Sequence, residues 1–203
     1  MDKKLVIEFI GTFFLVLTVA ATGNPIAVGV ALATFVYMGG HISGGHYNPA
    51  VTFALYLNKK IDQADALRYG LTQLVAGLAA SLIYLFIFGS KFLPTTASSA
   101  NFFTAFLVEL LFTFLLCFVV LNVAASSKTK GNQYYGLAIG LALMVGAFAG
   151  GPISGGAFNP AVGVGPLLFD FTHLSTHLGN ILLYLIGPLS GGALAAYLFK
   201  NID

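Results

Sequence analysis

Long apolar blocks separated by short polar breaks dominate the pattern of this chain. Six of the blocks have about the length that a helix needs to cross the hydrocarbon core of a bilayer, roughly 20 residues. They predict six membrane-spanning helices, over Leu5–Ala21, Ile26–Gly40, Ala66–Gly89, Phe102–Ala125, Tyr135–Gly150 and Leu178–Phe199. A cleaved signal peptide is the alternative for the first block, although a charge inside its apolar run, Glu8, argues against this.

Two further segments are apolar but too short to cross a bilayer, and both contain Asn-Pro-Ala: His41–Leu57 and Pro152–Phe169. Asn is a preferred N-cap and Pro is tolerated in the first helical turn, so each motif predicts the start of a half helix. Irregular backbone at membrane depth is tolerated only inside protein or beside water. The glycine-rich stretches before the motifs, Gly40–Gly45 and Gly150–Gly156, are therefore expected to line a water-filled pore.

The two halves of the chain resemble each other. Ile7–Leu15 matches Val108–Leu116 at a distance of 101 residues, and Ser43–Val51 matches Ser154–Val162 at a distance of 111 residues. Three spans per half is an odd number, so the second half enters the membrane from the opposite side. We therefore predict an all-α membrane protein, six transmembrane helices plus two re-entrant half helices in an inverted repeat. It forms a single channel domain, 1–203, with repeats of about 1–90 and 101–203.

Composition and charge narrow the possibilities further. Apolar residues make up 58% of the chain and charged residues only 8%, against about 25% charged in a soluble domain. This excludes a sizeable extramembrane domain and a nucleic-acid binder, and the single Cys117 excludes an intramolecular disulfide. Of nine Lys and Arg residues only Lys91 falls in the predicted outer loops. The positive-inside rule then places both termini in the cytoplasm of a multi-pass protein, in the plasma or inner membrane.

The paired motifs, together with a Glu in the first and fourth spans, resemble the major intrinsic protein family, the aquaporins and aquaglyceroporins. The resemblance covers essentially the whole chain, and the residues that carry it are Asn48, Pro49, Ala50, Asn159, Pro160, Ala161, Glu8 and Glu109. It implies a homotetramer with one pore per subunit, in which the Asn48 and Asn159 amides donate hydrogen bonds to the passing solute. It also implies that the two Glu residues accept hydrogen bonds from the re-entrant loops.

At the outer selectivity filter this sequence departs from the family pattern. Most members have Arg after the second motif, where this chain has Val162. The other positions that match the filter are Val28, Ala147 and Gly156. This set is small and apolar, so we expect a wider and less polar opening than in a water-selective channel. The set differs from the water-selective pattern, and Gly163 stands where glycerol facilitators have Asp, which leaves the subfamily open.

The function that these features favour is a passive channel for water and small uncharged solutes such as glycerol, urea, ammonia or hydrogen peroxide. No nucleotide-binding loop or nucleophile constellation indicates an enzyme, and neither a cofactor nor a metal is expected. One alternative is an ion-coupled secondary transporter with Glu8 and Glu109 as coupling carboxylates. Another is a structural membrane protein whose apolar pore conducts poorly because it dewets.

Four histidines and two glycine pairs complete the candidates. His41 is expected to line the pore and His46 to pack within the first loop, whereas His173 and His177 are expected to be solvated. The glycine pairs have the spacing of close contacts between membrane helices: Gly136 with Gly140, and Gly187 with Gly191.

Overall fold

The computed structural model describes residues 2–203, and these form only helices, turns and loops. Six helical stretches in this part of the chain are long and apolar enough to cross a membrane, so the predicted spans are confirmed. They are α1 (Lys3–Thr22), α2 (Pro25–Ser43), α4 (Gln63–Phe88), α5 (Phe102–Val120) with its π-helical end Leu121–Ala125, α6 (Tyr135–Ser154) and α9 (Leu174–Ile202).

Two spans run further than predicted, into the glycine-rich stretches. α2 ends at Ser43 and α6 at Ser154, and the next residue in each case is a glycine in the left-handed region, Gly44 (φ 92°) and Gly155 (φ 88°). Glycine adopts this conformation at little cost, so it stops the helix there. The irregular backbone is therefore shorter than the sequence suggested.

The half helices are α3 (Pro49–Leu57) and, in the second half, α7 (Pro160–Gly163) followed by α8 (Gly165–Phe169). The expected second half helix is thus broken at Val164. Pro166 has no N–H, so the helical bond that would run to the Val162 carbonyl is missing at the junction of α7 and α8. Two short 3₁₀ turns, Ser127–Thr129 and Phe171–His173, complete the elements.

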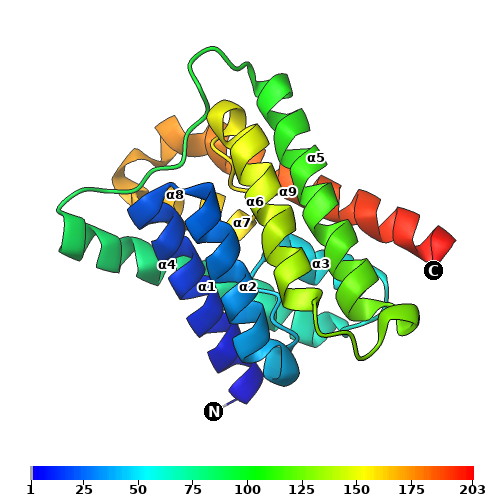
Figure 1. Cartoon of the computed structure of the whole chain (residues 1–203). Coiled ribbons are helices and arrows are strands. Elements are labelled where there is room, and N and C mark those ends of the chain that lie inside the picture. The colour runs from blue at the N-terminus through cyan, green and yellow to red at the C-terminus, as the bar shows by residue number, and fades with distance from the viewer. Residues whose placement is uncertain (1) are drawn as a thin grey trace.

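The re-entrant helices of each half pack against a long helix of the other half. In the first half α1 packs against α2 and α4, and in the second α5 packs against α6 and α9, while α2 and α6 meet between the halves. α3 packs mainly against α9 and less closely against α4, α8 packs mainly against α4, and α7 contacts both α4 and α9 (Figure 1). Each half therefore supplies the helix that supports the other half's re-entrant segment.

Both ends of the chain lie on one face of the bundle, here called the termini face. Lys4 reaches Asp65 at the start of α4, and Lys128 reaches Asp203. The opposite face, here called the Lys91 face, is crossed by the α4–α5 connection, residues 89–101, which runs over the top of the view in Figure 1 while the N-terminus lies at the bottom.

The close helix contacts predicted from the glycine pairs are confirmed. A Cβ added to Gly140 would lie 2.7 Å from the Ala33 Cβ of α2, and one added to Gly187 would lie 2.8 Å from the Glu109 Cβ of α5. At Gly191 the neighbour is backbone, with the Phe114 nitrogen 2.8 Å away. Because backbone cannot rotate aside as a side chain can, a larger residue at this position has to separate α9 from α5.

We therefore expect Gly191→Leu to lower the free energy of unfolding by about 1–3 kcal/mol or more, the usual cost of overpacking. The measurement is the midpoint of thermal unfolding in detergent. Gly179→Leu is the matched control, because a Cβ at Gly179 on the same helix meets no atom within 4 Å. Equal unfolding midpoints for the two variants would show that the α5–α9 contact is not a tight one.

Candidate functional site

Asn48 and Asn159 link the two re-entrant segments to each other. Each side-chain oxygen caps its own half helix, by accepting from the Ala50 nitrogen at 2.8 Å and the Ala161 nitrogen at 2.9 Å. Each Nδ2 donates across to the other segment, from Asn48 to the Phe158 carbonyl and from Asn159 to the Tyr47 carbonyl, both at 2.9 Å. An amide nitrogen carries two hydrogens, so each Asn keeps a second donor for a molecule beside it.

The residue before each Asn has left-handed backbone, which directs its carbonyl toward the Asn of the other half. Tyr47 has φ 49° and Phe158 has φ 48°, a conformation that costs a non-glycine residue of order 1–3 kcal/mol. Both rings are fully buried and hold the turn in place. The Tyr47 ring occupies the space beside Gly11 and Gly39, where a Cβ would overlap it.

Two buried carboxylates hold the loops from behind. Glu8 accepts from the Ser43 hydroxyl (2.7 Å) and from the backbone nitrogens of His46 (2.9 Å) and Tyr47 (2.7 Å). Glu109 repeats these three bonds, from Ser154 (2.7 Å), Ala157 (3.0 Å) and Phe158 (2.7 Å), whereas Glu8 also accepts from Gln73 Nε2 at 2.8 Å. Both side chains are 0% exposed. They satisfy backbone donors that find no partner in helix or solvent.

A narrow cavity lies beside the two Asn side chains. Its volume of about 20 Å³ is close to the space of a single water. It shares lining residues with a vestibule of about 530 Å³ on the termini face and with one of about 470 Å³ on the Lys91 face. Gly45 and His46 border the first opening, and Val28 and Gly156 border the second.

The wall of the narrow cavity repeats itself between the two halves. Every residue that lines it has a partner 101 or 111 positions away that also lines it. The pairs are Leu15 with Leu116, Val19 with Val120, Val28 with Ile139, Leu32 with Leu143, Gly45 with Gly156, His46 with Ala157, Asn48 with Asn159, and Val51 with Val162. In one pair only, His46 and Ala157, one side chain is polar and the other apolar. The wall is otherwise apolar, apart from the two Asn amides and loop backbone.

The residues predicted for the filter are divided between this cavity and the Lys91-face vestibule. Val28 and Gly156 line both the cavity and the vestibule, Val162 lines the cavity, and Ala147 lines the vestibule alone. The single arginine, Arg68, lies exposed on α4 with its guanidinium 3.6 Å from Asp65. It does not reach this opening.

The two candidate histidines lie on the termini side. His41 lines the vestibule of that face. His46 is buried, with Nδ1 3.1 Å from the Thr52 hydroxyl and its ring packed edge-on against Tyr69, and it also borders the narrow cavity.

Sequence reasoning missed most of the apolar wall and two supporting tyrosines. Tyr69 and Tyr184 donate to the carbonyls of Ser43 and Ser154, at 2.8 and 2.7 Å, and so hold the ends of α2 and α6. The internal repeat carried a signal for the wall, because residues of one half that face a pore on the two-fold axis have equivalents in the other half.

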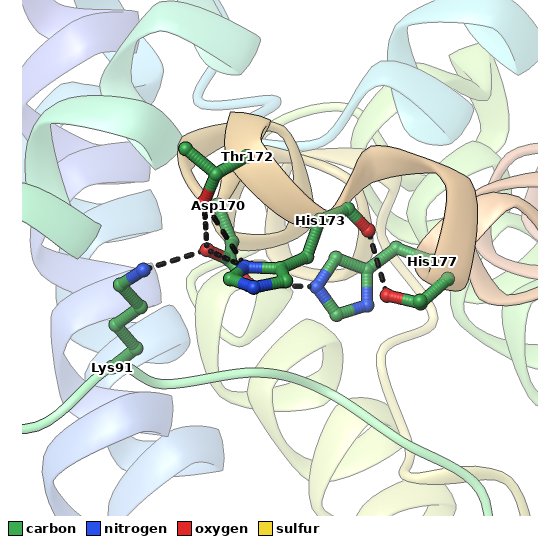
Figure 2. Close-up of polar contacts among 6 residues, drawn as sticks. Lys91, Asp170, Thr172, His173 and His177 are labelled. Carbon is green, nitrogen blue, oxygen red and sulfur yellow. Dashed lines mark hydrogen bonds and ion pairs between the residues drawn. The ribbon is translucent and has the colours of Figure 1, made fainter.

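On the Lys91 face, Asp170 collects four polar neighbours (Figure 2). Its carboxylate is 2.6 Å from Lys91 Nζ, 2.9 Å from His177 Nε2 and 3.1 Å from His173 Nδ1. The prediction of a solvated His177 is wrong, since its side chain is only 15% exposed, whereas that of His173 is 63% exposed. Hydrogen bonds from His177, Lys91 and His173 hold the pKa of Asp170 well below its usual range.

This cluster fixes one wall of the vestibule. Lys91 belongs to the α4–α5 connection, and Phe92–Thr95, which follow it directly, line the vestibule beside Val28 and Ala147. The same connection is tied to α6 by a bond from the Ala97 nitrogen to the Ile153 carbonyl, 3.0 Å. The connection is therefore anchored on both sides of the residues that border the opening.

Comparisons with known proteins agree with this architecture. The sequence profile of the family described as "Major intrinsic protein" matches residues 23–199. The chain belongs to the major intrinsic protein family. As a member it is a multi-pass membrane channel and not an enzyme.

Relatives occur in bacteria and plants. The chain is 36% identical to "Glycerol uptake facilitator protein-like 6" of Lactiplantibacillus plantarum, over 96% of this chain and 95% of that one. It is 33% identical to "Nodulin-26" of Glycine max, over 98% and 78%. Among solved structures, the aquaglyceroporin from Plasmodium falciparum superimposes with a TM-score of 0.84 at 21% identity, over 98% of this chain and 96% of that one. The predicted fold class is thereby confirmed.

Glu109→Gln is expected to destabilise this family member by about 1–3 kcal/mol or more. The amide nitrogen of Gln would face backbone N–H donors, so at least one of them would lose its acceptor. Thermal unfolding in detergent measures the effect. Asp62→Asn is the control, because it removes the same charge while Asn retains a capping oxygen for α4. A Gln variant of wild-type stability that had lost response to a proton gradient would favour the transporter alternative.

Asp170→Asn is expected to lower the unfolding midpoint both at pH 8 and at pH 5. Because the pKa of Asp170 is depressed in the folded protein, the carboxylate stabilises the fold above its unfolded pKa, about 3.9. That contribution is lost only as the pH falls through the folded pKa. The difference between wild type and variant should therefore shrink below about pH 4. A difference that vanished above pH 5 would contradict this, and Asp65→Asn controls for the weaker surface pairs at 3.5 and 3.6 Å.

Proposed function

We propose that this protein is a passive channel for water and small uncharged solutes, with the path through Asn48 and Asn159 as its pore. The observation that carries the proposal is the position of the two amides. They are held from both sides at the narrow cavity that joins the two vestibules. A solute at this point has two fixed donors to bind and otherwise meets an almost entirely apolar wall.

Passage of an uncharged solute is favoured by this arrangement over passage of a cation. The free hydrogens of the two amides replace part of the solute's hydration, while the apolar wall offers little that would hold it. The N-termini of α3 and α7 meet here, and their positive ends oppose cations. Exclusion of cations then rests on the half helices and the two amides, because the filter contains no arginine.

The apolar filter supports permeation by solutes larger than water. Val28, Ala147, Gly156 and Val162 offer no charge and no long side chain at the Lys91-face opening. A relative named as a glycerol uptake facilitator-like protein is consistent with glycerol-sized solutes. Urea, ammonia and hydrogen peroxide are of the same class.

The topology in the cell is part of the proposal. The excess of Lys and Arg on the termini face favours a cytoplasmic location for that face, in a plasma or inner membrane. The family resemblance supports a homotetramer with a pore in each subunit. Glu8 and Glu109 serve as supports for the loops, since their carboxylates are fully buried and bonded to loop donors.

Val162→Arg is expected to lower the ratio of glycerol to water permeability by about tenfold, which equals about 1.4 kcal/mol in barrier height. A guanidinium would narrow the opening and present fixed donors and a permanent charge. The measurement is stopped-flow swelling of proteoliposomes at matched insertion.

Val162→Met is the matched control, because it adds length without charge. A wild type that already passes water alone, or a ratio that Arg leaves unchanged, would show that the limiting constriction lies elsewhere. Absence of any permeability above that of empty liposomes would favour the poorly conducting alternative.

A further inference from the structure

An apolar groove on the outside of the bundle is not used by the pore. It lies where α3 packs between α4 and α9, with a volume of about 340 Å³, and its walls include Phe53 of α3, Leu67, Gly70 and Leu71 of α4, and Leu185 of α9. Leu67 and Leu71 are 62% and 65% exposed. In a membrane-spanning helix these side chains face hydrocarbon or another protein.

The groove has the depth of one leaflet. Its α4 wall runs from Gln63 to Leu74, about 16 Å of helix at a rise of 1.5 Å per residue. Half of the hydrocarbon core of a bilayer is about 15 Å thick. At its inner end the groove reaches Pro49 and Pro160, the first residues of the half helices.

The groove is lined almost entirely by apolar groups. Thr52, Tyr56 and Gln63 are the lining residues that carry a polar side-chain group. A hydrocarbon chain suits such a wall, because it brings no polar group that would be left without a hydrogen-bond partner.

A basic pocket adjoins the groove at the termini face. It is lined by Tyr56, which also borders the groove, by Lys59, Ile61 and Asp62, and by Lys60, which also lines the termini-face vestibule. Within residues 2–203 neither lysine takes part in an ion pair. Asp62 is the opposing charge, but its side-chain oxygen accepts from the Asp65 nitrogen at 2.8 Å as the cap of α4. The pocket therefore keeps a net positive charge at the end of the groove that Tyr56 borders.

We propose that the groove and this pocket form a binding site for an anionic phospholipid, with one acyl chain along α4 and the phosphate at Lys59 and Lys60. Charge complementarity and the match to one leaflet identify the occupant as a lipid of the surrounding bilayer. The occupant contacts the outer side of α3, whose N-terminus carries Asn48, so the lipid would stabilise the half helix without entering the pore.

Gly70 allows the groove to be filled without strain. A Cβ at Gly70 meets no atom within 4 Å, so Gly70→Leu places its side chain in the space meant for the acyl chain. Gly179→Leu is the matched control, since a Cβ there also meets nothing within 4 Å and Gly179 lines none of the pockets described. Lys59→Gln/Lys60→Gln removes the charge, and Lys200→Gln controls for an exposed lysine elsewhere on the termini face.

The experiment is native mass spectrometry of the purified full chain in detergent, titrated with dioleoyl phosphatidylglycerol or dioleoyl phosphatidylcholine. Wild type should bind the anionic lipid at least tenfold more tightly than the zwitterionic one. The double lysine variant should lose about 30-fold in affinity for the anionic lipid, on the basis of the usual contribution per basic residue. Gly70→Leu should weaken binding of both lipids by about tenfold, and both controls should bind as wild type.

Three outcomes would overturn the proposal. Equal affinity of wild type for the two lipids would remove the role of the basic pocket. Lipid binding by Gly70→Leu that equals that of Gly179→Leu would place the lipid elsewhere. A change in oligomer mass in Gly70→Leu, with lipid binding unchanged, would assign the groove to a second copy of the chain. None of these readouts depends on permeability, so they are independent of the proposed channel function.

Discussion

The structure depends on satisfying backbone polar groups at the centre of a membrane. Half helices that start at this depth leave backbone N–H donors and carbonyls that no water can reach from the lipid side. Each such group costs about several kcal/mol if it has no hydrogen-bond partner. Glu8 and Glu109 accept the loop donors, and the Asn48 and Asn159 amides bind the loop carbonyls. Pore and scaffold are consequently built from the same hydrogen bonds.

The exchange of half helices makes this arrangement cooperative. α3 packs mainly on α9, and α8 packs mainly on α4. Each Asn side chain also donates a hydrogen bond to the loop of the other half. Neither re-entrant segment has its full set of partners within its own half. Close approach at Gly140 and Gly191 brings the spans near enough for these short bonds to form. Packing between the spans thereby sets the geometry at the pore.

The two ends of the pore differ although the narrow wall is nearly symmetric. On the Lys91 face the opening is bordered by a connection that an ion pair with Asp170 anchors, whereas the termini face carries His41, Lys60 and Lys130 around its vestibule. Within the narrow cavity the two halves differ in polarity at one position, where the first half has His46 and the second has Ala157. Functional asymmetry is thus concentrated in loops, while the spans keep the duplicated pattern.

The sequence by itself determined the spans, the half helices at Asn-Pro-Ala and the motif residues, because length, hydropathy and helix caps are local properties. It did not show which apolar side chains line the pore. In a span nearly every position is apolar, whether it faces lipid, core or pore, so no helical periodicity separates Leu32 from an exposed neighbour such as Val30. Only the tertiary structure decided that Leu15, Leu32 and their repeat partners face the path. The partial burial of His177 beside Asp170 and the groove along α4 likewise depend on packing within the folded bundle.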